Sequence, residues 1–281
     1  MAFVALITVA SSGIGEATAR RLAREPGVKL VLLARRAERL QALATELGGA
    51  STIALDLTDP GAPQRVRDTI EREHGQLNML VNNAGASWHG SFAEGGWDNV
   101  ERHMQLNFEA PVRLTQALLP LLRETAREPS GPGVCIVNVA STAGRVSRPN
   151  AGGYSASKFA LAGWTDALHG EERPHGIHVG LVLPGFVKTE GFPATELLAK
   201  PQTRWLVSTP EKVAEAIYEA GPGGHAERYV PRPYWIPAAL RILLPGLVRR
   251  ATAGGAFTTA TATATARDAE RSSKLERSLD H

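Results

Sequence analysis

Short apolar runs alternate with helix-like stretches from Phe3 to Val230, and this alternation limits the possible folds more than any other feature. The runs carry Val, Ile and Leu on consecutive residues, which is typical of strands buried on both faces. We expect strands over residues 3–10, 28–35, 51–59, 77–85, 133–141, 177–185 and 227–231. Helices are expected over residues 15–27, 36–49, 63–75, 97–127, 154–172 and 209–221. The alternation predicts a doubly wound α/β fold around a parallel sheet, whose ligands bind at the carboxyl ends of the strands.

The composition of the chain changes after residue 232. Residues 1–232 are interpreted as one catalytic α/β domain of the Rossmann type. Residues 233–252 mix proline, aromatic side chains and arginine, and this extension could lie on a membrane surface, over the substrate pocket or against a partner subunit. Residues 253–281 are rich in Ala and Thr and then in charges, so we expect a disordered tail.

Charge and cysteine usage exclude several classes of protein. The formal net charge of +3, without a long basic block, argues against nucleic-acid binding. No apolar run reaches the roughly 18 residues of a membrane helix, and the apolar N-terminus follows no Lys or Arg, so we interpret it as a strand rather than a signal peptide. The single cysteine, Cys135, lies in an apolar run and fits a reducing compartment. A cytoplasmic protein with no metal site is expected.

The segment TVASSGIG, Thr8 to Gly15, joins the first strand to the first helix. Gly13 would let the backbone approach a pyrophosphate, and Gly15 would let the helix pack closely on the strand. The N-terminus of that helix offers free N–H groups and the positive end of its dipole to a phosphate. An ordinary strand-to-helix turn explains the same glycines, so the context has to decide.

Arg35 and Arg36 follow the second strand, at the spacing where a dinucleotide fold selects the ribose of its coenzyme. An acidic residue there would bind the 2′-hydroxyl of NAD. Two guanidinium groups instead suit the 2′-phosphate of NADP(H). The alternative is a solvated charge pair at a helix start, which the positive end of the helix dipole disfavours.

Tyr154 and Lys158 are four residues apart and share one face of a helix, and Ser141 ends the preceding strand. A neighbouring cation lowers the free energy needed to ionise a phenol to a phenolate. A tyrosine in this pair can therefore act as a proton donor or base. A serine hydroxyl can hold a carbonyl oxygen in place. Taken alone, a tyrosine such as Tyr154 is more often a half-buried structural residue.

Three further segments complete an ordered set of five motifs. NNAG occupies residues 82–85, Asn107 lies in LNFEAPVRLTQ, and PGFVKT covers residues 184–189. In this order the five motifs resemble those of the short-chain dehydrogenase/reductase family, over roughly residues 3–232. The resemblance implies a Rossmann-like fold and a nicotinamide coenzyme, which performs the hydride chemistry while the protein supplies position and a proton.

The resemblance also implies a role for each matching residue. Tyr154 would be the general acid/base, Lys158 would lower its pKa and hold the nicotinamide ribose, and Ser141 would orient the substrate carbonyl. Asn107 would support a proton-relay water, although alone it could merely cap a helical turn. Asp56 would bond the adenine amino group. The other coenzyme-binding residues that the resemblance implies are Thr8, Ser11, Ser12, Gly13, Ile14, Gly15, Arg35, Arg36, Leu57, Asn83, Ala84, Gly85, Pro184, Gly185, Val187 and Thr189.

The predicted function is hydride transfer between NADP(H) and the carbonyl or hydroxyl carbon of an apolar ketone, aldehyde or alcohol. The apolar preference rests on the variable segment 190–207, although core packing explains its side chains nearly as well. These apolar residues are Phe192, Leu197, Leu198, Trp205 and Leu206. The helices at 107–127 and 154–172 match the usual subunit contacts of the family, so a homodimer or homotetramer is expected.

Val9 stands where the family has its first glycine. Because valine avoids positive φ, we expect Val9 to stay extended as the last strand residue, with Ala10, Ser11 and Ser12 making the turn. This departure predicts weaker coenzyme binding. It also keeps a second hypothesis open, in which the chain is a catalytically idle Rossmann-like protein that serves as a nucleotide-binding or assembly subunit.

Overall fold

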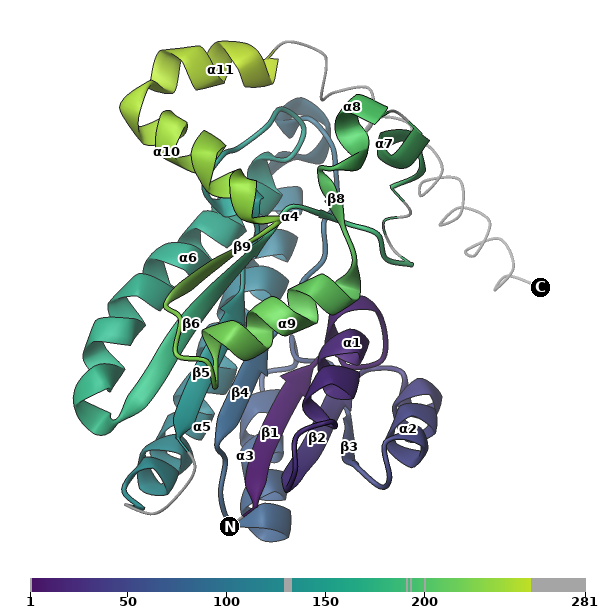
Figure 1. The fold of residues 1–281 in the computed structure, drawn as a ribbon, viewed down its shortest axis with the longest axis vertical. Helices are drawn as coiled ribbons and strands as arrows, with labels where there is room; N and C mark the ends of the chain where they lie inside the picture. The colour runs from purple at the N-terminus through teal and green to yellow at the C-terminus, as the bar shows by residue number, and fades with distance from the viewer. Residues whose placement is uncertain (1, 129–132, 191, 193, 200, 254–281) are drawn as a thin grey trace.

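A computed structural model describes residues 2–253 of the 281-residue chain, apart from residues 129–132, 191, 193 and 200. Its centre is a sheet of seven strands in the order β3-β2-β1-β4-β5-β6-β9, and every neighbouring pair is parallel (Figure 1). The doubly wound α/β fold is therefore confirmed. The strands are β1 (Phe3–Thr8), β2 (Val28–Ala34), β3 (Ser51–Ala54), β4 (Met79–Asn82), β5 (Val134–Val139), β6 (Ile177–Pro184) and β9 (Glu227–Val230).

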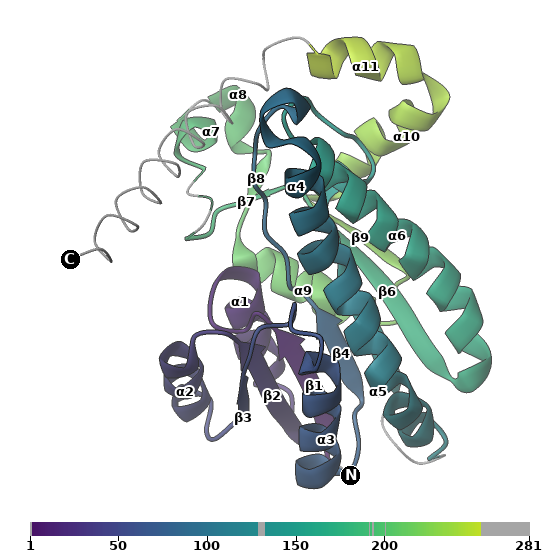
Figure 2. The same ribbon diagram turned by 180° about the vertical axis from the view of Figure 1, so that it is seen from behind.

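Helices cover both faces of the sheet, and a separate apolar cluster fills each side (Figures 1 and 2). One face packs against α1 (Gly13–Leu22), α2 (Ala37–Glu46) and α9 (Pro210–Ala220). The other packs against α3 (Ala62–His74), α5 (Ala110–Ala126) and α6 (Gly152–Glu172). Strands buried on both faces explain the continuous apolar runs of the sequence. Cys135 is buried among them, as expected, and burial raises the pKa of its thiol to about 12.

The long helix expected over residues 97–127 is divided in the structure. α4 (Phe92–Met104) passes into a π-helical turn, Gln105–Glu109, before α5 begins. Such turns are rare and insert an extra residue into the helix, often beside a functional site. This one contains Asn107, whose side chain is fully buried.

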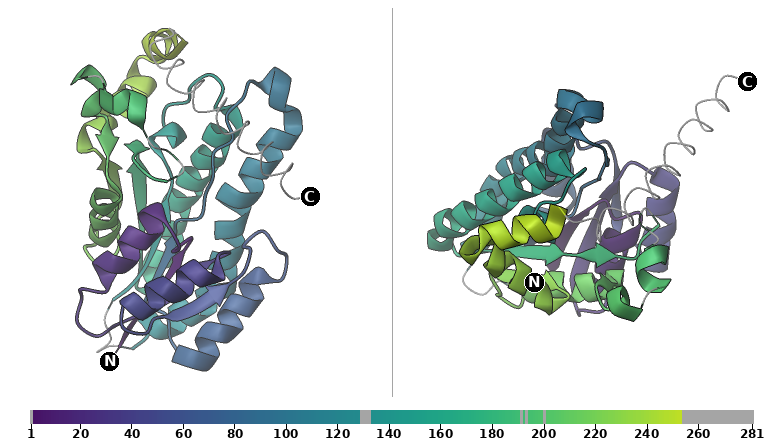
Figure 3. Two further views of the ribbon diagram at one scale, coloured as in Figure 1. Left: turned by 90° about the vertical axis from the view of Figure 1, so that its right-hand side faces the viewer. Right: turned by 90° about the horizontal axis from the view of Figure 1, so that it is seen from above.

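Several short elements gather beyond the carboxyl ends of the strands, at the top of Figure 1 and at the top of the left panel of Figure 3. They are β7 (Phe186–Val187), α7 (Thr195–Ala199), α8 (Pro201–Arg204), β8 (Val207–Ser208), the single turn Arg232–Tyr234, α10 (Trp235–Leu243) and α11 (Pro245–Ala253). Ile242, Leu243 and Leu247 expose more than half of their surface here.

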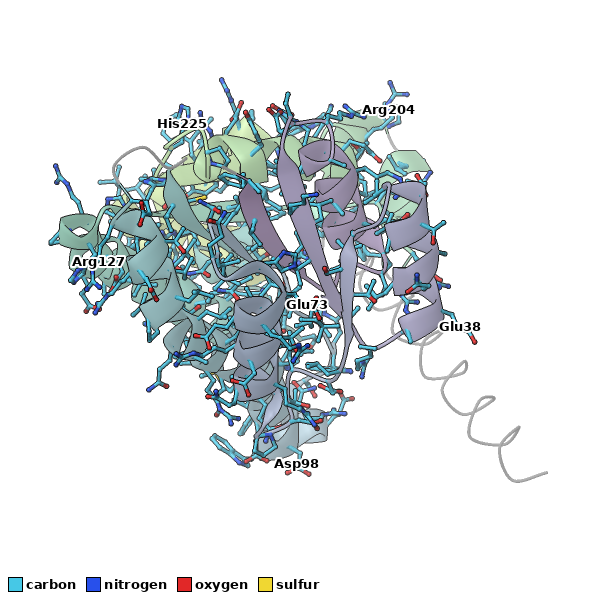
Figure 4. All side chains as sticks on the ribbon, turned by 90° about the horizontal axis from the view of Figure 1, so that it is seen from below. Glu38, Glu73, Asp98, Arg127, Arg204 and His225 are labelled. Atoms are coloured by element: carbon cyan, nitrogen blue, oxygen red, sulfur yellow. The ribbon has the colours of Figure 1, made fainter. Side chains whose placement is uncertain are left out.

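Charged side chains lie mainly on the outside of the molecule. Figure 4 shows Glu38, Asp98 and Arg204 at the periphery, pointing away from the sheet. Within the described residues, no helix is both long enough and apolar enough to cross a membrane. The tail predicted for 253–281 falls, from residue 254 on, outside the described residues, and the division at residue 232 stays a prediction.

Candidate active site

The site forms where the strand order reverses, between β1 and β4. In an open parallel sheet this reversal leaves a crevice at the carboxyl ends of the strands, because the connections leave in opposite directions. The predicted residues all follow the ends of strands β1 to β6, apart from Asn107 and the pair on α6. The fold therefore gathers motifs that lie up to about 180 residues apart in the sequence.

The threonine of the glycine turn ties β1 to the NNAG segment. Thr8 Oγ1 accepts hydrogen bonds from the backbone N–H groups of Asn83 (2.8 Å) and Ala84 (3.0 Å), and donates to the Val81 carbonyl (3.1 Å). Asn83 Nδ2 donates in turn to the Thr8 carbonyl at 3.0 Å. These bonds fix the backbone on both sides of the crevice, so the structure joins the two motifs that the sequence predicted to act together.

The expectation that Val9 stays extended is wrong. Val9 has φ of 53°, in the left-handed region that the family's glycine adopts without strain. The reason lies at Gly15, because a Cβ there would collide with the Val9 carbonyl and the Asn83 amide. The helix therefore packs directly on the turn, and the valine accepts an unfavourable conformation to let it do so. That conformation costs about 1–3 kcal/mol.

The two arginines predicted to act as a pair point to different partners. Arg36 lies against the glycine turn, where its Nη2 donates to Ser12 Oγ (2.8 Å) and Ser11 Oγ (3.3 Å). Arg35 instead forms an ion pair with Asp56 at 3.5 Å. A phosphate beside the turn would therefore meet Arg36 first.

A glutamate that the sequence analysis did not single out lies close to the same turn. Glu190 pairs with Arg39 at 2.7 Å and approaches Arg36 at 3.9 Å. The bond to Arg39 and its charge lower the pKa of Glu190, so this exposed carboxylate is charged at neutral pH. It places a negative charge where the 2′-phosphate of NADP(H) would bind.

Asp56 is held by its own loop. Partial burial acts against its charged form, but hydrogen bonds from the backbone and hydroxyl of Thr58, and the charge of Arg35, keep its pKa below the usual range. Leu57 beside it is buried in the core. The carboxylate is fixed at the outer end of the crevice, where the resemblance places the adenine.

Tyr154 and Lys158 lie on α6, with Ser141 beside them after β5. Burial raises the pKa of the Tyr154 phenol, while its hydrogen bond with Ser141 and the charge of Arg148 act in the opposite direction. Burial lowers the pKa of Lys158 to about 8, and its Nζ donates to the Val139 carbonyl at 2.9 Å. Ser141 Oγ also donates to the Pro184 carbonyl at 3.3 Å. The structure thus places Ser141 against Tyr154, with Lys158 about one helical turn further along α6.

Asn107 is held by both ends of its amide. Its Oδ1 accepts from the Ala86 N–H (2.9 Å), and its Nδ2 donates to the Ala86 carbonyl and to Ser157 Oγ (both 3.0 Å). A Cβ on Gly85 would lie 3.2 Å from Asn107 Oδ1 and 3.1 Å from Lys158 Nζ. Asn107 therefore lies near the lysine, and the absence of a side chain at Gly85 leaves the space between them open.

The segment Pro184–Thr189 closes the crevice from the other side. Val187 is buried, and Thr189 approaches the glycine turn, since a Cβ on Gly13 would lie 3.4 Å from its methyl group. Gly185 packs under the ring of Tyr234, where a Cβ would come within 2.5 Å of a ring carbon. A glycine is required at position 185 so that the Tyr234 ring can lie this close to the backbone.

Besides Glu190, the sequence analysis did not single out three further residues near the site. Tyr234 donates a hydrogen bond to the Leu206 carbonyl at 3.1 Å, and burial raises its pKa to about 12. His103 accepts the Trp88 N–H at 3.0 Å and presents its ring edge to Tyr154, 6.0 Å between centroids. Arg148 lies beside Tyr154 and over the Phe186 ring. The only sequence signal for Arg148 was its position within the segment that joins Ser141 to Tyr154.

The apolar residues of segment 190–207 differ in how far the structure buries them. Leu197 is buried, whereas Trp205 exposes 59% of its surface. Phe192 stacks on Phe186 with 5.7 Å between ring centroids. Phe186 in turn lies under Arg148, whose charge acts on Tyr154.

The donor set at this edge fits a nicotinamide dinucleotide coenzyme. Ser12 precedes α1 without a side-chain cap, so N–H groups of the first turn are available to a pyrophosphate. Lys158 carries three donors, and among the described residues one of them bonds an acceptor, Val139. Arg36 offers a cation beside the turn. No cluster of side chains among the described residues could hold a metal ion.

Comparison with known proteins agrees with this geometry. A family profile for short chain dehydrogenases matches residues 3–196. The dehydrogenase/reductase SDR family member 7B of Bos taurus is 35% identical over 196 residues, which is 66% of this chain and 58% of that protein. The chain therefore matches somewhat under three-fifths of the length of that relative.

Solved structures are similar over most of the chain. A short-chain dehydrogenase from Streptomyces avermitilis has a TM-score of 0.71 and 31% identity, covering 90% of this chain and 98% of its own. An actinorhodin polyketide ketoreductase solved with NADPH has a TM-score of 0.71 and 29% identity, covering 81% of this chain and 95% of its own.

Proposed function

The chain belongs to the short-chain dehydrogenase family, a family of oxidoreductases, and from that premise we propose that it uses NADP(H) to interconvert an apolar ketone or aldehyde and its alcohol. The observation that carries the proposal is the convergence of Ser141, Tyr154 and Lys158 at the carboxyl edge of the sheet. A protein that only bound a nucleotide would not need a buried lysine beside a tyrosine.

In the reduction direction, Tyr154 donates the proton of its phenol to the carbonyl oxygen. Ser141 bonds this phenol, and its hydroxyl is placed to hold the same oxygen. The charge on Lys158 favours the phenolate that remains. Asn107 is fixed by Ala86 and Ser157 near the lysine. There it would support a water molecule that relays protons between Lys158 and solvent. The bound coenzyme supplies or accepts the hydride.

Preference for NADP(H) follows from the cations beside the glycine turn. Arg36 is hydrogen-bonded to the turn itself and presents a guanidinium group where the 2′-phosphate would bind. No carboxylate follows β2 directly to select a 2′-hydroxyl. The NADPH-bound ketoreductase structure supports the same choice.

The proposal is tested by NADPH fluorescence and by turnover with a panel of apolar carbonyl compounds. We expect NADPH to bind and at least one ketone or aldehyde to be reduced. Tyr154→Phe should lower the rate by about a hundredfold or more, the size of a general acid's contribution, and leave NADPH binding unchanged, because the phenol acts only when a proton moves. Several per cent of residual activity in this variant would contradict the role given to Tyr154.

The idle alternative predicts a different result. A nucleotide-binding or assembly subunit would bind NADPH but reduce no carbonyl compound, and Tyr154→Phe would change nothing. The ordered hydrogen bonds of Asn107 and Lys158 favour catalysis, because a decayed site has no need to keep them.

We also propose that the chain forms a homodimer or homotetramer through α5 and α6. Phe159 on α6 exposes 42% of its surface and is a large apolar side chain for such a contact. Analytical ultracentrifugation of the wild type and of Phe159→Glu would test this assembly, and a monomeric wild type would refute it.

A further inference from the structure

Two arginines on the same loop, between Ser141 and α6, differ in their partners. Arg145 forms ion pairs with Glu227 (2.8 Å) and Asp166 (3.7 Å). Arg148, three residues later, has no carboxylate within ion-pair distance among the described residues. Its guanidinium lies 4.8 Å from the centroid of the Phe186 ring. Arg145 therefore has a structural role, whereas the charge of Arg148 is left without a counterion.

Arg148 faces the reacting end of the site. Its charge acts on the phenols of both Tyr154 and Tyr234. These two tyrosines and Phe186 come from three separate elements, α6, the turn after β9, and β7. The guanidinium thus lies against Phe186, close enough to Tyr154 and Tyr234 for its charge to act on both phenols.

Burial makes this unpaired cation unfavourable. It lowers the pKa of Arg148, although a guanidinium remains charged in proteins. A partly buried cation without a counterion is unfavourable, and a bidentate anion is the ligand that offsets this best. The contact with Phe186 compensates part of it and also holds the guanidinium plane in place.

An anion bound by Arg148 would not be the 2′-phosphate of the coenzyme. The cation at the 2′-phosphate end is Arg36, which bonds Ser11 and Ser12 beside β1. Arg148 lies on the connection between β5 and α6, and its charge acts on Tyr154. This position favours an anion of the substrate over the 2′-phosphate.

We propose that Arg148 binds an anionic group of the substrate, so that the site acts on carbonyl compounds whose apolar body carries a carboxylate, phosphate or sulfonate. This inference rests on the proposed function and refines it. The aromatic pair Phe186 and Phe192 contacts the apolar body, while Arg148 sets its orientation relative to Tyr154. Arg148 is thus a residue that determines specificity.

Binding of unreactive probes tests the inference without turnover. Octanoate, octyl phosphate and octanol are titrated into the full-length protein saturated with NADP⁺, by isothermal calorimetry. We expect at least one of the two anions to bind at least tenfold more tightly than octanol, and Arg148→Leu to abolish that difference. Arg148→Lys should restore part of it, because the charge returns without the planar fork. Equal binding of octanol and both anions to the wild type would overturn the inference.

Kinetics separate this inference from the proposed function. Medium-chain keto acids are compared with their methyl esters, using NADPH. We expect kcat/KM to favour the acids in the wild type, and Arg148→Leu to raise KM for the acids at least tenfold while the esters change little. Arg145→Gln is the matched control: it should lower Tm and leave the acid-to-ester ratio unchanged. Turnover without an acid preference refutes the role of Arg148 alone, whereas anion-selective binding without any turnover refutes the proposed reaction alone.

Discussion

The residues around the glycine turn and those around Phe186 differ in how their polar groups are satisfied. At the turn, Thr8 and Asn83 exchange hydrogen bonds, and Arg36 bonds the serines. Arg148, in contrast, lies over the aromatic ring of Phe186, and its charge has no ion-pair partner among the described residues. A site prepared for one constant ligand can fix its backbone in advance, whereas a substrate pocket keeps unsatisfied groups for a ligand that arrives from outside.

The largest effect on the coenzyme side should come from Arg36. Arg36→Ala is expected to weaken NADPH binding by about 1–3 kcal/mol, the worth of a charged hydrogen bond, and to leave NADH binding nearly unchanged. Arg35→Ala is the matched control, because Arg35 is paired with Asp56 and should matter less. Fluorescence titration with both coenzymes measures the two effects, and a larger loss in Arg35→Ala would reverse the assignment.

The fold was predictable from sequence, because continuous apolar runs define buried parallel strands. The four-residue spacing of Tyr154 and Lys158 predicted that they share one face of a helix, whereas their catalytic roles rest on the family resemblance. Arg148 and Tyr234 carried no such signal. Their role depends on contacts across the chain, with Phe186 and Gly185, and no spacing within one segment reports those contacts.

The error at Val9 has a similar cause. Local preference places a valine in extended conformation, and the sequence-based expectation followed it. The structure places Val9 at φ of 53° because Gly15 allows helix α1 to press on the Val9 carbonyl. A tertiary contact overrides the local preference, as it often does at functional turns.

The pH dependence of reduction should report Lys158. Burial lowers its pKa to about 8, so the charged form that supports the Tyr154 phenolate is present below this pH and is lost above it. We expect kcat/KM to fall about tenfold per pH unit once the pH exceeds that pKa. Lys158→Arg keeps its charge and should move this fall to higher pH. A profile that stays flat from neutral pH to well above the lysine pKa would exclude this role.

Glu190 links the two regions. It follows Phe186 closely in the sequence, and its carboxylate pairs with Arg39 and approaches Arg36 beside the glycine turn. Its carboxylate competes with a 2′-phosphate for those cations. Glu190→Gln should therefore tighten NADPH binding a few-fold and leave NADH binding unchanged. The gain should shrink in high salt, because the group is exposed and its charge is screened. Equal gains for both coenzymes would show that the charge does not act on the 2′-phosphate.

The smallest effect is expected at Val9, and it should appear in stability rather than in coenzyme affinity. The positive φ of Val9 costs about 1–3 kcal/mol, so Val9→Gly relieves strain but loses the packing of a partly buried side chain. Val9→Ala loses most of that packing and keeps the strain. Denaturant unfolding should therefore find the glycine variant more stable than the alanine variant by about 1 kcal/mol, the reverse of the usual order. Coenzyme binding should be equal in all three proteins, because the strain is present with and without ligand. An alanine variant more stable than the glycine variant would mean that residue 9 does not hold the left-handed conformation.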